Sequence, residues 1–284
     1  METLHSLLKS GEETLMAAGV REYKLDAWYL LSYVTGVDRT KYLCDKFKSV
    51  PEKQACRYRE LAGRRAERIP LQQITGRQEF MGLSFVVNSN VLIPRQDTEI
   101  LVEEAGKLLL DKRGVRVLDL CTGSGCILIS LEYYYGKRGN GAVSYAVGSD
   151  ISPEALAVAE QNARMNGSDI SLVKGDLFEN IEGKYDLIVS NPPYIRTDVI
   201  ASLEPEVREH EPALALDGQA DGLYFYRKII AEAKQYLLPG GSLLLEIGFD
   251  QKNEVLAMLR DSGYTEARAV KDLAGLDRVC MACV

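Results

Sequence analysis

From residue 115 onward, short apolar runs alternate with segments of helical spacing, and this alternation constrains the fold more than any other feature of the sequence. Strands that alternate with helices along a chain pair into a mostly parallel sheet with helices on both faces. The runs with the length and composition of buried strands lie at 115–121, 142–150, 170–176, 185–190 and 241–248. Two further runs, 267–272 and 277–284, are expected to form an antiparallel terminal hairpin. We therefore predict an α/β fold with a seven-stranded, mostly parallel sheet.

Residues 1–75 have the spacing of helices, and we predict a small α-helical domain here. Leucines at positions 4, 7, 8 and 15 fall near one face of the first helix. A later helix is rich in arginine, for which a solvent-exposed face is the favoured interpretation and partner binding the alternative. Its arginines are Arg57, Arg59, Arg64, Arg65 and Arg68.

Residues 76–95 join the two zones and change from helical to alternating spacing. Phe85–Val87 and Val91–Ile93 flank the turn-forming residues 88–90, which predicts a β-hairpin linker. Residues 96–284 then form the larger domain, which begins with a helix opened by Asp97 or a close neighbour.

Charge and hydropathy narrow the classes of function. The 284 residues carry a net charge of −7, and residues 1–75 carry +3, so that the larger zone carries −10. An acidic domain repels a polyanion and tolerates a cationic ligand, which argues against a nucleic-acid partner. No apolar run is long enough to span a membrane, and the first residues lack the pattern of a signal peptide. A cytoplasmic protein is expected.

The six cysteines are too sparse for a disulfide framework. Cys280 and Cys283 have CxxC spacing, but no second pair follows, and His5 and His210 are the only histidines. We interpret the pair as small buried residues of a terminal strand and expect no metal site.

Glycine and acidic residues mark the ends of the first three predicted strands. In sheets of this kind ligands bind beyond the carboxyl ends of the strands. Asp150 ends the second strand, where a carboxylate can accept both hydroxyls of a ribose. Asp176, followed by Leu177, ends the third strand, placed to meet an adenine edge. The first strand ends in a turn whose glycines let the backbone approach a ligand closely, and its candidate residues are Asp119, Cys121, Thr122, Gly123, Ser124 and Gly125.

This glycine turn does not match a dinucleotide or P-loop site. Counting from Gly123, the last position of a GxGxxG motif is Leu128 instead of a small residue, and the P-loop lysine is lacking. A ligand with a ribose but no phosphate fits better, and S-adenosylmethionine is such a ligand. Its sulfonium cation suits an acidic pocket, and its carboxylate could face the helix N-terminus after Gly125.

The fourth strand ends in the tetrapeptide Asn191-Pro192-Pro193-Tyr194. One strand-terminating residue is enough to end a strand, so this rigid sequence indicates a binding site of defined shape. For the tetrapeptide taken alone, a plain turn is the alternative. The order and spacing of the four strand ends resemble the class I S-adenosylmethionine-dependent methyltransferases, which implies a Rossmann-like sheet. The tetrapeptide resembles the signature of amino-methyltransferases, which methylate planar NH₂ groups of adenine, guanine or glutamine.

Three further stretches narrow the resemblance: VLIPRQDTEILVE (91–103), EPALALDG (211–218) and DGLYFYRKI (221–229). Together they resemble the glutamine-N5 methyltransferases of peptide chain release factors, over nearly the whole chain. The resemblance implies methyl transfer from S-adenosylmethionine to the glutamine of the Gly-Gly-Gln motif of release factors, leaving S-adenosylhomocysteine. It also implies that residues 1–75 recognise the release factor and that 96–284 form the methyltransferase domain. No membrane partner and no direct nucleic-acid substrate are expected, and the protein is expected to be a monomer.

The tetrapeptide suggests how an amide nitrogen is methylated. Such a nitrogen is a poor nucleophile because its lone pair is delocalised into the carbonyl. The side-chain oxygen of Asn191 and the backbone carbonyl of Pro192 can each accept one N–H, and the prolines hold these acceptors in place. Tyr194 can stack on the flat amide, and Pro193 completes the predicted substrate site. Orientation is expected to dominate, without a strong general base.

Weaker candidates lie outside these motifs. Arg95 and Glu99 resemble family positions near the substrate entrance, and an ion pair at the start of a helix is the alternative. Glu246 is expected either to line the pocket or to pair locally. A set of polar residues is not interpreted as a metal site, since methyl transfer needs no metal: Glu204, Glu206, His210 and Glu211.

The chain departs from the family pattern at three positions. Cys121 replaces the usual first glycine of the turn, so the backbone must accept a side chain there. Gln96 stands where proline is frequent, and Leu177 where an aromatic residue is frequent.

Two other functions are compatible with the same motifs. One is methylation of a DNA or rRNA base, since a flipped base presents the same planar NH₂ group. The acidic larger domain and the lack of an additional target-reading domain argue against it. The other is a cofactor-binding module without catalysis, against which the intact Asn191 and Tyr194 argue, since either could be lost without harm to the fold.

Overall fold

The computed structural model describes residues 2–284, and the chain divides into two compact units. The smaller unit consists of the residues up to Arg77 together with Glu204–His210. The larger unit consists of Gln78–Leu203 and Glu211–Val284. Each unit has hydrophobic clusters of its own. The smaller unit is therefore discontinuous in sequence, because residues 204–210 are separated from the rest of it by the first part of the larger unit.

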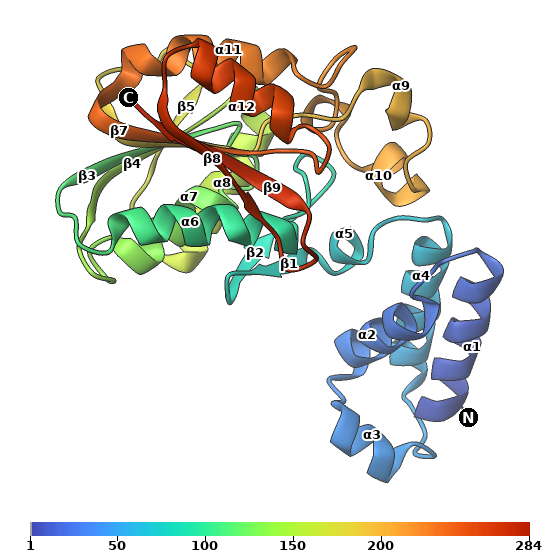
Figure 1. The fold of residues 1–284 in the computed structure, drawn as a ribbon. Coiled ribbons are helices and arrows are strands. Elements are labelled where there is room, and N and C mark those ends of the chain that lie inside the picture. The colour runs from blue at the N-terminus through green and yellow to red at the C-terminus, as the bar shows by residue number, and fades with distance from the viewer. Residues whose placement is uncertain (1) are drawn as a thin grey trace. The chain divides into compact units, whose positions relative to one another are not determined.

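A seven-stranded sheet forms the centre of the larger unit (Figure 1). Its strands are β3 (Val115–Leu120), β4 (Val143–Asp150), β5 (Ser171–Lys174), β6 (Tyr185–Ser190), β7 (Leu237–Glu246), β8 (Thr265–Lys271) and β9 (Asp277–Cys283). The spatial order is β5-β4-β3-β6-β7-β9-β8, with β3 to β7 parallel and β9 antiparallel to both of its neighbours. The predicted α/β fold with a terminal antiparallel hairpin is confirmed.

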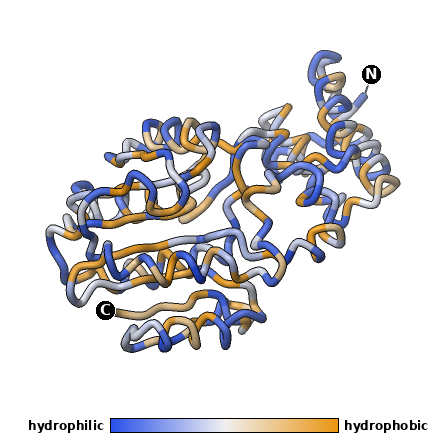
Figure 2. Tube along the Cα trace, turned by 90° about the horizontal axis from the view of Figure 1, so that it is seen from above, coloured by the Kyte–Doolittle hydropathy of each residue, from blue (hydrophilic) through white to orange (hydrophobic). Residues whose placement is uncertain are grey.

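Helices cover both faces of this sheet, as Figure 1 shows. On one face α6 (Glu99–Leu109), α7 (Cys126–Tyr135) and α8 (Pro153–Asn166) pack around one buried cluster. On the other face α11 (Tyr224–Tyr236) and α12 (Lys252–Asp261) pack around a second. Along most helices the trace in Figure 2 alternates between hydrophobic and hydrophilic residues, as expected for elements with one buried face. Within residues 2–284, no helix combines the length and apolar character needed to cross a membrane.

The order of the strands determines where a ligand can bind. β3 comes first in the sequence among the parallel strands, and it lies between β4 on one side and β6 on the other. The chain therefore leaves β3 in one direction and later returns to its opposite side, which opens a crevice at the carboxyl ends of these two strands. The glycine turn follows β3 and the Asn-Pro-Pro-Tyr tetrapeptide follows β6, so both lie at this crevice.

The predicted linker hairpin is present, but its strands lie earlier in the sequence than expected. β1 (Arg77–Phe80) and β2 (Leu83–Val86) form a two-stranded sheet joined at Met81 and Gly82. Both turn residues have positive φ, 50° and 70°, which suits a two-residue hairpin turn. This turn has no usual signal in the sequence, because methionine rarely adopts a left-handed conformation.

The prediction of a strand at Val91–Ile93 was wrong. This stretch has no strand partner, and Asn88 instead forms a turn by accepting a hydrogen bond from the backbone N–H of Asn90 at 2.9 Å. Val91 is buried in a small cluster with Val87 and two residues of α8. The apolar run therefore packs beside a helix, and burial alone does not distinguish that arrangement from a strand.

The smaller unit is helical, as predicted. It contains α1 (Leu4–Ala17), α2 (Tyr23–Thr35), α3 (Arg39–Asp45), α4 (Glu52–Ala66), α5 (Leu71–Thr75) and α10 (Pro205–His210). The leucines at 4, 7, 8 and 15 are all buried in its core. The short helix α9 (Thr197–Ile200) and the 3₁₀ turns η1 (Gln96–Thr98) and η2 (Ala213–Ala215) belong to the larger unit.

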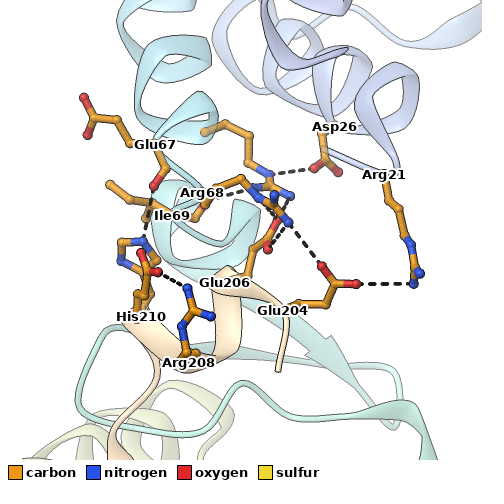
Figure 3. Close-up of polar contacts among 11 residues, drawn as sticks. Arg21, Asp26, Glu67, Arg68, Ile69, Glu204, Glu206, Arg208 and His210 are labelled. Carbon is orange, nitrogen blue, oxygen red and sulfur yellow. Dashed lines mark hydrogen bonds and ion pairs between the residues drawn. The ribbon is translucent and has the colours of Figure 1, made fainter. Parts of the chain in front are cut away.

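Two glutamates, Glu206 in α10 and Glu204 just before it, are held by arginines at the end of α4 (Figure 3). Arg65 donates to Asp26 at 2.7 Å and to Glu206 at 2.8 Å. Arg68, whose φ of 65° is left-handed, donates to Glu206 at 2.8 Å and lies 3.3 Å from Glu204. Arg65 is buried, so the interpretation of the arginine run as a solvent-exposed face was wrong for this residue. An arginine can be buried in this way because each of its carboxylate partners satisfies part of the guanidinium group.

The Glu206 carboxylate is expected to make the stability of the smaller unit depend on pH. Burial acts to raise its pKa, but hydrogen bonds from Arg68 and Arg65 outweigh burial and hold the pKa at about 2, below the ordinary 4.5. A lowered pKa stabilises the fold above the ordinary value, and this stabilisation is lost as the pH falls from about 4.5 toward 2. Glu206→Gln is expected to cost about 2–3 kcal/mol at pH 7 and much less at pH 3.

Urea unfolding followed by fluorescence tests this prediction, because the single tryptophan, Trp28, is buried in the smaller unit. Glu204→Gln is the matched control. The Glu204 side chain is 53% exposed, and its loss is expected to cost less than about 0.5 kcal/mol. An equal cost for both variants, or a Glu206→Gln cost that is the same at pH 7 and pH 3, would contradict the prediction.

Candidate active site

A cavity of about 250 Å³ lies at the carboxyl ends of β3, β4, β5 and β6, within the larger unit. Most of the residues that the sequence singled out at the strand ends line it. They are Cys121, Thr122, Gly123, Ser124, Asp150, Asp176, Leu177, Asn191 and Pro193, together with Arg95. Asp119, Gly125, Pro192, Tyr194 and Glu99 do not line the cavity, although each lies next to a residue that does or within two residues of one.

The turn after β3 is fixed by backbone hydrogen bonds. The N–H of Thr122 donates to the carbonyl of Ser149 on β4 at 2.9 Å, and the N–H of Gly125 donates back to the carbonyl of Thr122 at 2.8 Å. Gly123 and Gly125 have φ of 54° and 78°, a conformation that glycine adopts without strain. A side chain at Gly125 would also meet Ile129 and Ala159. The turn brings backbone groups close to the space where a ligand would lie.

Two of the departures from the family pattern carry backbone strain. Cys121 has φ of 57° and Leu177 has φ of 53°, so both hold an L-residue in the left-handed region. This conformation costs a residue with a Cβ roughly 1–2 kcal/mol. It gives a physical reason why glycine suits position 121. Both residues line the cavity, so the strained backbone lies where the ligand would bind.

Asp150 links the end of β4 to the glycine turn. One of its carboxylate oxygens accepts from the N–H of Gly123 at 2.9 Å, and the other accepts from the N–H of Ser152 at 2.9 Å. Burial raises the pKa of Asp150, and the hydrogen bonds from Ser152 and Gly123 oppose that shift. A carboxylate has about four acceptor sites, so the Asp150 side chain keeps acceptor capacity for a ligand. Asp150 can therefore hold the turn and accept hydroxyl groups of a ligand at once.

Asp119 lies behind the turn, fully buried at the end of β3. Burial raises its pKa to about 7, and a hydrogen bond from the Thr122 hydroxyl opposes the shift. Thr122 donates to one carboxylate oxygen at 2.6 Å, and the other oxygen has no hydrogen-bond partner within residues 2–284. Asp119 thus supports Thr122, which itself lines the cavity.

At the third strand end, Asp176 is paired with a residue that the sequence analysis did not select. Its carboxylate accepts from the ammonium group of Lys228 on α11 at 2.8 Å. The Lys228 ammonium nitrogen also lies 5.4 Å from the ring centroid of Tyr224, a residue of the cavity wall. The pairing holds the Asp176 side chain against α11 at the edge of the cavity.

The tetrapeptide after β6 is anchored at both ends. The side-chain nitrogen of Asn191 lies 3.4 Å from the hydroxyl of Thr98. The backbone carbonyl of Tyr194 accepts from the Gln251 side chain at 3.0 Å. The phenolic hydroxyl of Tyr194 donates to the Glu246 carboxylate at 3.4 Å. Tyr194 packs against the hydrophobic cluster of α11 and α12, and burial raises the pKa of its hydroxyl. The chain is therefore rigid where Asn191 meets the cavity.

Arg95 and Glu99 do not form the ion pair that was the alternative interpretation. Both side-chain oxygens of Glu211 accept from Arg95, at 2.8 and 2.6 Å. Glu99 accepts from the backbone N–H of Met81 at 2.6 Å, in the turn of the β1–β2 hairpin. The ion-pair alternative was therefore wrong, since each side chain has a partner distant in sequence. Arg95 remains at the cavity wall, whereas Glu99 supports the hairpin.

Part of the cavity wall consists of residues that were not predicted as site residues. Tyr224 and Phe225, which lie within one of the family-like stretches, were not chosen as site residues, although aromatic residues beside a predicted adenine site were a usable signal. The other missed wall residues that lie outside the predicted strand ends include Leu92, Pro94, Thr98, Ile127, Pro212, Leu214 and Ala215.

The fold of this chain occurs in a solved methyltransferase. A solved methyltransferase from Pyrococcus furiosus covers 72% of this chain, and the match spans 90% of that structure at 19% identity with a TM-score of 0.53. Residues 96–204 match the family model of the methyltransferase small domain. The fold and the site therefore define a methyltransferase, an enzyme that uses a bound methyl donor.

The remaining comparisons identify the family. Residues 6–76 match the family model of the PrmC N-terminal domain. The chain is 42% identical to the release factor glutamine methyltransferase of Geobacter sulfurreducens, over 98% of this chain and 95% of that protein. It is 41% identical to the enzyme of the same name from Agrobacterium fabrum, over 98% and 96%. The chain belongs to the release factor glutamine methyltransferase family.

Proposed function

We propose that the protein transfers a methyl group from S-adenosylmethionine to the side-chain nitrogen, N5, of the glutamine in the Gly-Gly-Gln motif of peptide chain release factors. The observation that carries this proposal is that Asn191 lines the same cavity as the glycine turn and Asp150. The family membership agrees with it, because the relatives reported above are named release factor glutamine methyltransferases.

The residues of the cavity fit S-adenosylmethionine. The glycine turn supports close approach of a carboxylate or a ribose, and Asp150 keeps lone pairs for two ribose hydroxyls. Asp176 and Leu177 lie just after β5, and Tyr224 and Phe225 begin α11. All four line the cavity and would hold the adenine ring. When bound, this cofactor supplies a methyl group on a positively charged sulfur atom, and acidic side chains at the strand ends favour that charge.

The Asn-Pro-Pro-Tyr tetrapeptide would hold the substrate amide. Its two N–H groups need two acceptors, and the side-chain oxygen of Asn191 and the backbone carbonyl of Pro192 have the required chemistry. Prolines at 192 and 193 add no N–H that would compete for these acceptors. With both hydrogens held, the lone pair of the nitrogen is directed to one side of the amide. Such positioning can contribute about 7–11 kcal/mol to lowering a barrier, far more than one hydrogen bond in water.

Other parts of the chain would bind the protein substrate. Arg95, paired with Glu211 at the cavity wall, and the aromatic ring of Tyr194 are the proposed contacts for the segment around the glutamine, with Pro193 beside them. Glu99 acts through the hairpin that it supports. Residues 1–75 are the proposed recognition domain for the release factor. We propose that the enzyme acts as a monomer in the cytoplasm.

A labelling experiment tests the proposed substrate. The protein is incubated with S-adenosylmethionine labelled in the methyl group and with one substrate at a time. The substrates are a release factor, its Gly-Gly-Gln to Gly-Gly-Ala variant, rRNA and unmethylated DNA. Label is expected in the intact release factor alone. Label in rRNA or DNA would identify a base methyltransferase, and equal label in the Gly-Gly-Ala variant would place the modification elsewhere.

A further inference from the structure

The side-chain amide of Asn191 has two chemically different ends, and only one of them suits the proposed reaction. Its oxygen accepts hydrogen bonds, whereas its NH₂ group only donates them. A substrate amide that offers two N–H groups would meet a donor if the Asn191 side chain were turned by 180°. The active arrangement therefore needs a neighbour that holds the nitrogen of Asn191 and so leaves its oxygen for the substrate.

Thr98 is that neighbour. Asn191 Nδ2 donates to Thr98 Oγ1 at 3.4 Å, which turns Asn191 Oδ1 away from Thr98. Thr98 is the last residue of η1, is 2% exposed and lines the same cavity. Its backbone N–H donates to the carbonyl of Arg95 at 3.1 Å, so the position of its Cα is held independently of its side chain.

A hydroxyl that accepts from Asn191 still has one proton to donate, and the buried carboxylate of Glu246 is available as its acceptor, since Glu246 Oε2 has no partner within residues 2–284. Glu246 is the last residue of β7, is 1% exposed and lies beside both Thr98 and Tyr194. Burial raises the pKa of Glu246 to about 7, and the nearby Thr98 hydroxyl opposes this shift. Tyr194 Oη donates to Glu246 Oε1 at 3.4 Å, whereas Oε2 has no partner in the hydrogen-bond geometry of residues 2–284.

Both ends of the tetrapeptide lie near this one buried carboxylate. Asn191 donates to Thr98, whose hydroxyl acts on Glu246, and Tyr194 donates to Glu246 directly. When it is ionised, the Glu246 carboxylate can only accept hydrogen bonds from neighbouring hydroxyl groups. If the Thr98 hydroxyl donates to Glu246, its oxygen can only accept from Asn191. Thr98 therefore selects the orientation in which the Asn191 oxygen is left for the substrate.

We propose that Thr98, directed by Glu246, is a positioning residue that sets the orientation of the Asn191 side-chain amide toward the substrate glutamine. This inference rests on the proposed function, because it assumes that Asn191 accepts a hydrogen bond from the substrate. Thr98 itself transfers no proton and forms no bond to the methyl group.

Two variants of Thr98 separate the hydroxyl from the shape of the side chain. Thr98→Val keeps the branched shape and removes the hydroxyl, whereas Thr98→Ser keeps the hydroxyl and removes a methyl group. Thr98→Val is expected to lower kcat with a release factor by about 10-fold, the equivalent of about one neutral hydrogen bond. Thr98→Ser is expected to stay within about 2-fold of the wild type. The Kd of S-adenosylmethionine and the melting temperature are expected to change little in either variant.

A double-mutant cycle with Asn191→Ala distinguishes positioning from a general structural role. Without the Asn191 amide there is nothing for Thr98 to orient, so adding Thr98→Val to Asn191→Ala is expected to cost less than about 2-fold more. A 10-fold further loss in the double variant would overturn the inference. So would a Thr98→Val enzyme as active as the wild type, or equal losses in the valine and serine variants.

The wild-type assay keeps this inference separate from the proposed function. If the wild type methylates a release factor and Thr98→Val does so equally well, only the role of Thr98 fails. If the wild type labels no release factor, the proposed function fails, and the role assigned to Thr98 fails with it.

Discussion

Replacing Asn191 with alanine is expected to lower the turnover number for a release factor by about 100-fold or more. The variant loses one of the two proposed acceptors for the substrate N–H groups, and the amide nitrogen is no longer held in one orientation. Cofactor affinity is expected to change little, because the proposed cofactor contacts lie on the glycine turn and at the ends of β4 and β5. Single-turnover methylation with labelled cofactor measures the loss, and calorimetric titration measures cofactor binding.

The matched control for this variant is Asn253→Ala. Asn253 lies exposed in the first turn of α12 and does not line the cavity, so removing its amide is expected to leave turnover unchanged. An Asn191→Ala enzyme with near-normal turnover would remove Asn191 from the mechanism. A large loss of cofactor affinity in the same variant would assign Asn191 to the cofactor site instead.

Replacing Asp150 with alanine is expected to raise the Kd of S-adenosylmethionine by about 100-fold or more. The variant loses the proposed acceptor for two ribose hydroxyls, and hydrogen bonds to a charged group contribute about 1.5–3 kcal/mol each. It also releases the N–H of Gly123, which the carboxylate now holds at 2.9 Å. The loss is therefore expected to include a less ordered glycine turn. Equilibrium titration with S-adenosylmethionine and with its demethylated product measures both affinities.

Two variants test whether this loss comes from the carboxylate itself. Asp150→Asn keeps one acceptor oxygen and is expected to lose less affinity than Asp150→Ala. Asp169→Ala removes a carboxylate of the same domain that is 83% exposed and paired with a surface lysine, and it is expected to bind the cofactor normally. Normal binding by Asp150→Ala would show that the cofactor ribose does not lie at the end of β4.

The strands and their ends could be predicted because their signals are local. The central strands of the sheet are short segments rich in apolar residues, and the motifs that follow them contain glycine, proline or acidic residues. Parallel strands place their carboxyl ends on one edge, so the positions of Asp150, Asp176 and Asn191 around one cavity follow from topology. The hairpin was displaced because Met81 takes a left-handed conformation that its side chain gives no reason to expect.

The supporting residues could not be predicted because their partners are distant in sequence. Arg95 pairs with Glu211, and Asn191 contacts Thr98, across separations of 116 and 93 residues. A glutamate at the end of an apolar strand has no sequence signal that distinguishes a buried acceptor from a surface residue. The burial of Arg65 depends equally on tertiary partners. These contacts form only when the whole fold brings the elements together.

The discontinuous make-up of the smaller unit limits how this enzyme can be recombined. The chain passes between the two units three times, after Arg77, Leu203 and His210. In a chimera that receives only the first 77 residues from a relative, the arginines that hold Glu206 would be replaced, but Glu206 itself would not. Glu206 would then face side chains from a different protein. Transplanting substrate preference would therefore require a second insert, residues 204–210, from the same donor. Among relatives, a substitution in one of these two segments is therefore expected to be accompanied by a substitution in the other.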